Sequence, residues 1–563
     1  MSAAGEVHYN SRRSGRSGTA RTLNSHHPNP EWVPITARPA AIALNRLTPI
    51  QKFPFYCTAA GVLLLLVVLA PAQAVELRDV AALAKQRASE PYRTPPEIPA
   101  FLQELSYEQA RLFRFLPERR LWRASNSLFQ VSFIAPARHQ RYPVKIRRIT
   151  AEGVRDIPFD REQFDFGNPD LAKRIPPDLG FAGLRLEYPI NHSGEHEAVV
   201  EFSGASYFRG VGKGGVLGLW ARGLAIDTGL PGGEEFPLFS EFWLEQPRAA
   251  ATSLRMFALL EGPSVTGGYE FTLWPGDNTR ISVRAEIFTR KPVTMLGLAP
   301  LTSMFLYGEN TARPLGQWRP EMHHSDGLLV NDGSGEWLWR PLLNPRTPEL
   351  YGFTVNNAKG FGLLQRDRRF DAYEDGDAEY QLRPGAWVTL RQPTGPGRIV
   401  LVEIPSPDET NDNIVAFWSP EKAVPTGQRI VLDYDLFLGA SPEPDSTLAA
   451  VVNTLVGRPG GAQGRHPPAD AYRFVIDFAG GGLGKIKSRD TPVAGNVRVA
   501  GGEVLEQYVE YLPVPDRWRL VFVVRPEPES ESGMEMRAFL HLGDDTLSET
   551  WSYHLPFANS LTP

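Results

Sequence analysis

The chain has 563 residues with 51 glycines, 50 prolines and 10% aromatic residues, and its formal net charge is −5 at pH 7. Residues 1–74 carry seven basic and two acidic side chains, so the remaining chain has a net charge of −10. An acidic body argues against nucleic acid and anionic lipid as main partners, because both bind basic surfaces. The single cysteine, Cys57, lies in a segment that we expect to be removed. A mature chain without thiols excludes disulfides, cysteine catalysis and thiolate metal sites.

Residues 1–74 are predicted to form an N-terminal extension followed by a secretory signal peptide. Residues 1–50 show no hydrophobic periodicity, which is typical of disorder. Lys52 then precedes the apolar run 59–70 and a small-residue ending at Ala74. This order is typical of a cleaved secretory signal. An uncleaved anchor helix is the alternative, but the run is short for crossing a bilayer.

The next segment combines helical and proline-rich stretches. Apolar residues recur at helical spacing over 77–88, so we predict a helix there. A second short helix is expected over 106–114, with Ser106 as its N-cap.

From residue 128 to about 439, short apolar runs are bounded by Gly, Pro, Asn and Asp. The clearest runs are 129–134, 254–260, 269–274 and 399–404. Regular alternation with turn residues is typical of antiparallel sheets packed as a sandwich. No succession of strands and helices is present, which argues against a parallel α/β sheet. The sequence therefore predicts an all-β protein whose residues 75–440 form one large antiparallel β-sandwich.

The composition changes after residue 440. Residues 441–468 are rich in Gly, Pro and Gln, and we interpret them as a linker. Strand-like runs follow at 472–478, 518–524, 536–542 and 551–555. Their number and spacing predict a small immunoglobulin-like sandwich over 469–563.

Three motifs suggest cofactor, metal or protease chemistry but lack the required context. The run 210–215 matches a dinucleotide fingerprint, yet a strand-like segment follows it instead of a helix. The adjacent His323 and His324 would point to opposite sides of an extended chain, which is a poor metal site. Asp227 belongs to a single Asp-Thr-Gly, whereas aspartic proteases need two such loops. We therefore expect no cofactor and no metal.

The stretch 300–418 contains most of the unusual polar chemistry. Carboxylates, amides, arginines and tryptophans alternate there with Gly and Pro. Aromatic faces with carboxylates and bidentate donors suit a sugar, which offers flat C–H faces and a rim of hydroxyls. The substrate-binding candidates in this stretch are Glu309, Trp337, Trp339, Arg340, Arg366, Tyr373 and Asn411.

Trp337 and Trp339 are two residues apart, so they share one face of a strand. Core packing is one interpretation and is expected for at least one of them. A platform against which a sugar ring stacks is the other.

Asp326 and Asp412 are the candidate catalytic residues. Asp326 lies in a loop between Ser325 and Gly327, and Asp412 lies between two asparagines just before an apolar strand. Hydrolysis of a glycosidic bond needs two carboxyl groups, one that donates a proton and one that activates water. A loop aspartate that only forms a turn is the alternative for each of them.

Several long runs closely resemble the osmoregulated periplasmic glucan biosynthesis proteins G and D of Gram-negative bacteria. These runs are 204–209, 221–236, 300–310, 325–327, 331–341, 360–367 and 408–418. The resemblance extends from about Leu77 through the C-terminal domain and is weakest beyond Ser441.

This resemblance implies a periplasmic protein with a large sandwich of the galactose-mutarotase type and an immunoglobulin-like C-terminal domain. It also implies an inverting endo-β-1,2-glucanase-like glycoside hydrolase, with Asp412 as general acid and Asp326 as general base through water, or with the roles exchanged. His324 departs from the family pattern, in which an acidic residue is expected. That departure places the pH optimum in doubt, but not the fold.

The expected partners are β-1,2-glucan chains, the inner-membrane glucosyltransferase and a second copy of the chain, and no nucleic acid. A non-catalytic glucan-binding protein and a scaffold that docks the glucosyltransferase are the rival interpretations. The same fold would serve all three, because a fold does not fix a function.

Overall fold

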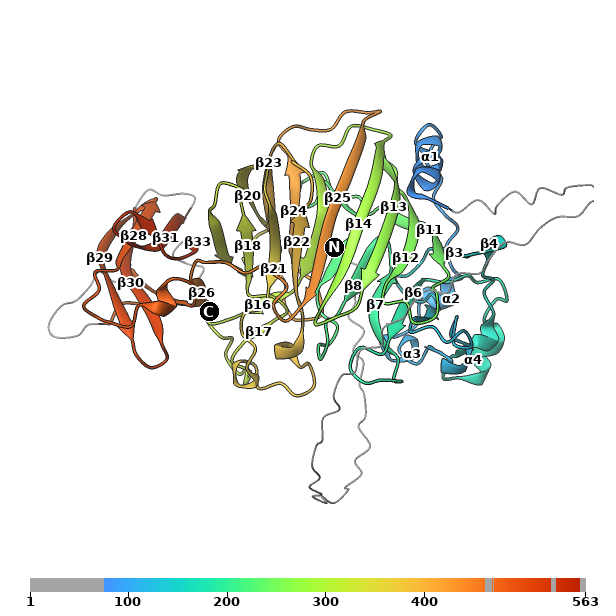
Figure 1. Ribbon diagram of the computed structural model, residues 1–563, viewed down its shortest axis with the longest axis horizontal. Helices are drawn as coiled ribbons and strands as arrows, with labels where there is room; N and C mark the ends of the chain where they lie inside the picture. The colour runs from blue at the N-terminus through green and yellow to red at the C-terminus, as the bar shows by residue number, and fades with distance from the viewer. Residues whose placement is uncertain (1–74, 461–467, 469, 528–532, 557–563) are drawn as a thin grey trace, which may run out of the picture. The chain divides into compact units, whose positions relative to one another are not determined.

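In the computed structural model, the described residues are 75–460, 468, 470–527 and 533–556. The predicted extension and signal peptide lie outside this range. Two large sheets dominate the described chain, as Figure 1 shows. Nearly all strand pairs in them are antiparallel, so the all-β prediction is confirmed.

The first sheet has ten strands. Their order is β2 (Gln130–Ile134), β6 (Gly183–Tyr188), β7 (Glu197–Ser203), β8 (Tyr207–Gly210), β9 (Trp220–Arg222), β15 (Leu296–Ser303), β24 (Ile414–Pro420), β23 (Pro396–Glu403) and β20 (Glu349–Asn356), with β10 (Leu224–Ile226) beside β15.

The second sheet has fifteen strands. Their order is β28 (Ala494–Ala500), β31 (Met534–Leu542), β33 (Thr550–Leu555), β19 (Trp337–Pro341), β18 (Gly327–Asn331), β21 (Gly360–Leu364), β22 (Gly385–Leu390), β25 (Arg429–Gly439), β14 (Asn278–Thr289), β13 (Val265–Trp274), β12 (Leu254–Glu261), β11 (Leu238–Glu245), β3 (Lys145–Thr150) and β4 (Gly153–Asp156), with β32 (Asp545–Thr546) beside β31.

Aromatic side chains fill the space between the two sheets. Phe202 on β7 and Phe208 on β8 both contact Phe271 on β13, with ring centroids 5.1 and 5.4 Å apart. All three rings are almost completely buried. Burial of such large apolar rings is the main stabilising term of the sandwich.

Helix α1 (Leu77–Ala88) confirms the first predicted helix and packs on the outer face of the second sheet. A Cβ at Gly268 of β13 would lie 2.5 Å from the backbone nitrogen of Ala81, so only glycine permits this close approach of helix and strand.

The second predicted helix is shorter than expected: α3 (Tyr107–Ala110) has Ser106 as its N-cap and ends after one turn. The remaining short elements are α2 (Ala100–Gln103), α4 (Pro169–Arg174), and the ribbons β1 (Arg114–Phe115) with β5 (Phe164–Asp165) and β16 (Phe305–Tyr307) with β17 (Met322–His323).

The C-terminal part contains a separate four-stranded sheet, ordered β26 (Ala450–Gly457), β27 (Tyr472–Ala479), β30 (Arg517–Pro526) and β29 (Gly502–Leu512). Phe474 and Phe522 of this sheet pack on Trp551 of β33, at 5.6 and 5.8 Å between ring centroids. The four strands predicted here from the sequence correspond to β27, β30, β31 and β33. Strand β26 lies inside the segment 441–468 that composition alone marks as a linker.

The second sheet continues from the large sandwich into the C-terminal strands. Parallel pairing of β19 with β33 places Leu338 opposite Thr550 and Trp339 opposite Trp551. Trp339 and Trp551 also belong to one hydrophobic core. The two parts of the chain therefore share a sheet and a core at this junction, which brings C-terminal side chains close to the candidate site.

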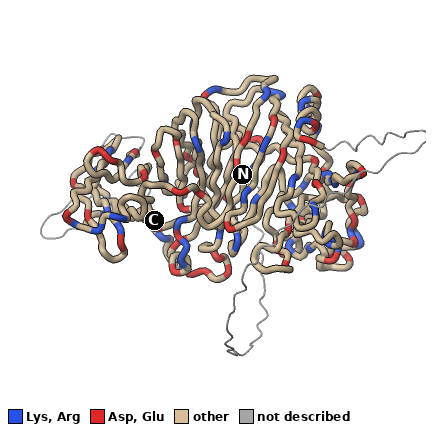
Figure 2. The backbone as a smooth tube through the Cα atoms, viewed as in Figure 1, with Lys and Arg blue, Asp and Glu red and all other residues tan. Residues whose placement is uncertain are grey.

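Charged residues of both signs occur along the described backbone, and Figure 2 shows them side by side in the loops near β16 and β17. Among the described residues, none of the helices has the length and apolar content that crossing a membrane requires.

Candidate functional site

Asp326 lies in the turn between β17 and β18, and its residue is only 7% exposed. Its Oδ2 accepts hydrogen bonds from the backbone N–H groups of Arg366 (2.8 Å) and Asp367 (3.4 Å). Its Oδ1 accepts none from the residues that the structure describes. Burial raises the pKa of Asp326, although nearby His323 and the Arg366 N–H oppose the shift. One oxygen is thus anchored while the other keeps its acceptor capacity.

Asp412 lies between β23 and β24 and is also 7% exposed. The next residue, Asn413, is buried and fixes the loop through its side-chain amide. Its Oδ1 accepts from the Phe305 N–H at 2.9 Å, and its Nδ2 donates to the Phe305 carbonyl at 2.9 Å and the Ile404 carbonyl at 3.1 Å. A fully used buried amide holds the backbone of its loop in one position.

Ser303, at the end of β15, connects the two aspartate loops. Its carbonyl accepts from the Asn413 N–H at 3.0 Å. Its hydroxyl lies 2.8 Å from the hydroxyl of Ser325, the residue before Asp326. The loops of Asp326 and Asp412, which are far apart in sequence, are therefore both bound to one buried serine.

An acidic group surrounds Asp326. His323 binds Glu321 through Nε2 at 2.9 Å and Gln365 through Nδ1 at 2.8 Å. Burial alone would lower the pKa of His323, but the hydrogen bond to Glu321 and the nearby carboxylates raise it to about 9. His323 is therefore a buried cation at neutral pH, and it partly offsets the negative charge of Asp326 and Glu321.

Glu309 and Asp367 complete this acidic group. Burial and the charge of Glu321 raise the pKa of Glu309 well above its usual value. Burial and the charge of Asp326 raise the pKa of Asp367 to about 7. Carboxylate oxygens of Glu309, Glu321 and Asp367 lie within 4.8 Å of one another, so the set could hold a hard divalent cation. Protonation of Glu309 and Asp367 relieves the same repulsion without a metal.

His324 lies on the other side of the Asp326 loop and is 1% exposed. Its Nε2 is hydrogen-bonded to the guanidinium of Arg383. A guanidinium only donates, so this Nε2 carries no proton and the imidazole is neutral. In place of the acidic residue that the family pattern predicts, the chain thus has a neutral acceptor paired with an arginine.

Three further residues lie near Asp412, and the sequence analysis did not select them. Arg222 donates through Nε to the Thr302 hydroxyl at 2.7 Å, pairs with Glu234, and lies over the ring of Tyr207 at 4.7 Å. Burial raises the pKa of Tyr207 to about 12, and the charges of Glu234 and Asp412 add to the shift while Arg222 opposes it. The runs 204–209 and 221–236, used for the family resemblance, already contained these residues.

Both candidate tryptophans pack on the core shared with the C-terminal strands, Trp339 as a buried member and Trp337 as a partly buried neighbour. Trp339 is 3% exposed and lies in the core shared with the C-terminal strands, and Trp337 stacks on Trp387 at 5.5 Å. A Cβ at Gly327 would meet the Trp339 ring at 2.1 Å, so this indole packs directly beneath the residue that follows Asp326. Of the two interpretations, core packing describes the place of both rings.

The two candidate arginines contact the C-terminal strands. Arg340 is 1% exposed and donates to Glu535 and to the Ser552 hydroxyl, both at 3.1 Å. Arg366 binds Glu549 with two nitrogens, at 2.9 and 2.7 Å, and lies over the Trp339 ring at 3.6 Å. Only the backbone N–H of Arg366 reaches Asp326.

The other three predicted contacts differ in exposure. Tyr373 is fully buried, and its hydroxyl donates to the Asp367 carbonyl at 3.1 Å. Glu309 accepts from the N–H of Thr454 on β26 at 3.2 Å. Asn411 is half-buried beside Asp412, and its amide donates to the Thr410 hydroxyl at 3.3 Å. Of the three, Asn411 is nearest in sequence to a candidate catalytic residue.

Trp318, which the sequence analysis did not select, is the exposed indole of this region, with 61% of its residue surface accessible. Its neighbour Arg319 lies near the indole ring at 5.6 Å and binds Asp375 at 3.0 Å and Glu409 at 3.4 Å. Glu409 belongs to the loop of Asp412. An exposed aromatic ring tied to that loop is a suitable surface for a sugar face.

Comparison with known proteins identifies relatives over nearly the whole described chain. The family model described as periplasmic glucan biosynthesis protein, MdoG, matches residues 75–555. A glucans biosynthesis protein G from Pseudomonas paraeruginosa (strain DSM 24068 / PA7) is 43% identical over 504 residues, which cover 88% of this chain and 96% of that protein. A glucans biosynthesis protein G from Ralstonia nicotianae is 42% identical over 499 residues, which cover 87% of this chain and 98% of that protein.

Proposed function

The chain belongs to the periplasmic glucan biosynthesis protein family, MdoG, and from this premise we propose that it hydrolyses or remodels β-1,2-glucan backbones in the periplasm with inversion at the anomeric carbon. The observation that carries the proposal is the pair of buried aspartates whose loops are both bound to Ser303. Two carboxyl groups from separate loops are the minimum that glycosidic hydrolysis requires.

In the proposed mechanism, Asp412 donates a proton to the glycosidic oxygen as the bond to the anomeric carbon breaks. Asp326 accepts a proton from the water that attacks the opposite face of the sugar. This sequence inverts the anomeric configuration and leaves Asp412 ionised and Asp326 protonated, so a proton must return to Asp412 through solvent. Carboxyl groups in such enzymes are typically about 6.5–9.5 Å apart, which leaves room for the water.

The surroundings of Asp326 support its assignment as the base. Its Oδ2 is fixed by the Arg366 N–H, while Oδ1 takes no hydrogen bond from the described residues and can accept one from water. The guanidinium of Arg366 pairs with Glu549, and its charge lowers the pKa of Asp326 without cancelling the increase caused by burial. A raised pKa also makes Asp326 a stronger base than an ordinary aspartate near neutral pH.

Incubation with linear β-1,2-glucan tests the proposal, with product size and anomeric configuration followed by chromatography and NMR. The wild type is expected to release shorter chains whose new reducing ends have inverted configuration. Asp412→Asn and Asp326→Asn are each expected to abolish cleavage while retaining glucan binding.

Asp332→Asn is the matched control, because Asp332 lies in a turn six residues from Asp326 and the amide keeps its turn-forming oxygen. It is expected to cleave at the wild-type rate. Glucan binding without cleavage by the wild type would overturn the hydrolase and leave a glucan-binding role.

A further inference from the structure

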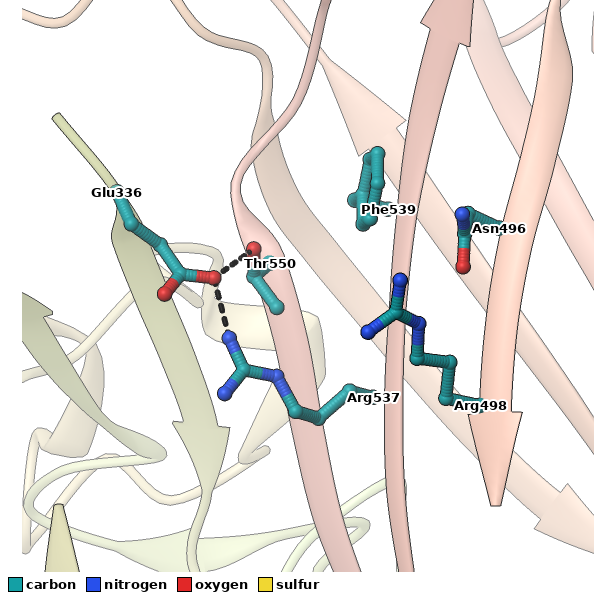
Figure 3. A pocket seen from close by; sticks show the side chains of 6 residues that line it. All are labelled: Glu336, Asn496, Arg498, Arg537, Phe539 and Thr550. Atoms are coloured by element: carbon teal, nitrogen blue, oxygen red, sulfur yellow. Dashed lines mark hydrogen bonds and ion pairs between the residues drawn. The ribbon is translucent and has the colours of Figure 1, made fainter.

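A hollow lies on the C-terminal strands, and neither candidate aspartate lines it. It has a volume of about 330 Å³ and is lined by Glu336, Asn496, Arg498, Arg537, Phe539 and Thr550, as Figure 3 shows. The lining side chains come from β28, β31, the start of β33 and the residue before β19. Trp551, the neighbour of Thr550, faces the buried core, so the hollow is on the opposite face of this sheet. None of its residues belongs to the proposed hydrolytic site.

Residues that pair across strands β28 and β31 line the hollow. Asn496 pairs with Phe539, and Arg498 pairs with Arg537, across β28 and β31. Directly paired residues project from the same face of a sheet. Figure 3 shows these four side chains pointing into one space.

One wall of the hollow is fixed by its own contacts. Glu336 accepts from the guanidinium of Arg537 and from the Thr550 hydroxyl, the latter at 2.6 Å. Arg498, directly opposite Arg537, has no hydrogen bond or ion pair with any residue that the structure describes, and it is exposed. The hollow therefore combines a rigid wall with one guanidinium whose five donors are available.

The chemistry of the lining suits a polyhydroxylated ligand. Arg498 and the Asn496 amide donate hydrogen bonds, the Asn496 oxygen and Glu336 accept them, and the half-buried Phe539 ring offers an apolar face. Sugar hydroxyls both donate and accept, and their C–H faces pack on aromatic rings. Glu336 is already paired with Arg537, so Arg498 leaves the lining with one net positive charge, and an anion such as phosphate is the competing ligand. The volume lies at the lower end of the range for ligand pockets, which suits a short segment of chain.

We propose that this hollow binds a glucosyl segment of the glucan, as a second contact point outside the hydrolytic site. The inference rests on the proposed function for the identity of the glycan. A chain held at a second point has a high effective concentration at the first, so the hollow would favour long glucans over short ones.

Hydrogen-exchange mass spectrometry on the Asp412→Asn protein tests the inference, because that variant is expected to bind linear β-1,2-glucan without consuming it. Glucan is expected to protect peptides of β28 and β31 as well as the loops of Asp326 and Asp412. Arg498→Ala and Phe539→Ala are expected to remove the protection of β28 and β31 and to weaken binding at this hollow by about tenfold.

Two matched controls separate this effect from general damage. Arg248→Ala removes an exposed arginine from a loop of the large sandwich, and Tyr508→Ala removes an exposed ring from β29. Both are expected to leave the protection of β28 and β31 unchanged. Loss of protection in the controls as well as in Arg498→Ala would overturn the assignment to this hollow.

The outcomes distinguish this inference from the proposed function. Protection confined to the Asp326 and Asp412 loops overturns the second contact and leaves the hydrolase intact. Protection of β28 and β31 by glucan, together with a wild-type protein that does not cleave glucan, supports the second contact and overturns the hydrolase. Protection of these strands by inorganic phosphate but not by glucan overturns the glycan as occupant.

Discussion

The two candidate catalytic aspartates are equally buried, but different parts of the chain hold them in place. Asp326 is bound by the backbone of Arg366, whose side chain is held by Glu549 183 residues later in the chain. Asp412 is fixed by Asn413, whose partners Phe305 and Ile404 belong to the large sandwich. One half of the proposed mechanism thus depends on the C-terminal strands, whereas the contacts of Asn413 beside Asp412 lie within the large sandwich.

This difference assigns a role to the C-terminal part beyond its own packing. Besides Glu549, the N–H of Thr454 on β26 binds Glu309, which adjoins the acidic group around Asp326. Residues that hold a reacting group in position contribute to activity, and their loss typically lowers it by about 10- to 100-fold. The general base is therefore expected to respond to changes in the C-terminal strands, whereas the general acid is not.

The largest expected effect comes from Glu549→Ala, which breaks the support of Asp326. Glu549 and Arg366 have side chains only 5% and 14% exposed, so the variant leaves Arg366 as an uncompensated buried cation. We expect a loss of about 3 kcal/mol in the free energy of unfolding, measured by denaturant titration. Under native conditions, cleavage of β-1,2-glucan is expected to fall about tenfold.

Glu503→Ala is the control, since Glu503 pairs with Arg525 on the exposed face of the C-terminal sheet. It is expected to change neither quantity appreciably. Wild-type stability and rate in Glu549→Ala would contradict the dependence of Asp326 on these strands.

The next largest effect is expected from Asn413→Ala, which acts on the Asp412 side alone. The variant leaves the Phe305 N–H and the Ile404 carbonyl without their buried partner, at a cost of about 2 kcal/mol in unfolding free energy. Cleavage is expected to fall while the titration behaviour of the Asp326 group stays that of the wild type. Asn411→Ala, which loses only a contact to Thr410, is the control for stability.

A titration sharpens the comparison, because Asp367, on the Asp326 side, is a carboxyl group with a raised pKa. The pKa of Asp367 is about 7 in the folded protein, above the value of about 3.9 in an unfolded chain. The folded protein therefore keeps a proton that the unfolded chain has released. Its contribution to stability is fully present below about pH 4 and is lost as pH rises to about 7.

Asp367→Asn cannot titrate, so its melting temperature is expected to fall less than that of the wild type between pH 4 and 8. Asp332→Asn should follow the wild-type curve. Identical slopes for wild type and Asp367→Asn would show that Asp367 does not hold a proton in the folded state.

The smallest effect is expected from Trp318→Ala, in the loop that contacts the Asp412 side through Arg319 and Glu409. The ring is exposed, so unfolding free energy should change by less than about 0.5 kcal/mol. If the indole stacks on a sugar, KM for β-1,2-glucan should rise severalfold with kcat little changed. Leu315→Ala, at a fully exposed position of the same loop, is the control.

Local sequence patterns predicted much of the architecture. Helical spacing over residues 77–88 predicted α1, and short alternating runs predicted the antiparallel sheets. The long family-like runs also selected Asp326 and Asp412, whose loops are both bound to Ser303. These signals were accessible because strand and helix periods, and the order of residues in a motif, are properties of neighbouring positions.

The environment of each side chain could not be predicted in this way. The sequence suggested Trp339 as a platform for a sugar ring. In the structure, this indole packs in a core with β33, a strand more than two hundred residues later in the chain. Arg340 and Arg366 have their partners in the same distant strands. Strand β26 lies in a segment whose composition indicated a linker, because its partner β27 supplies the pairing.

The sequence by itself determined the fold class and the family, and it selected the two candidate aspartates, since all three follow from local pattern and motif. Tertiary structure alone decided which aromatic rings are buried, which arginines are already paired, and which aspartate depends on the C-terminal strands. The physical reason is that burial and ion pairing depend on contacts between positions remote in the chain, and those contacts exist only once the sheets have closed over a common core.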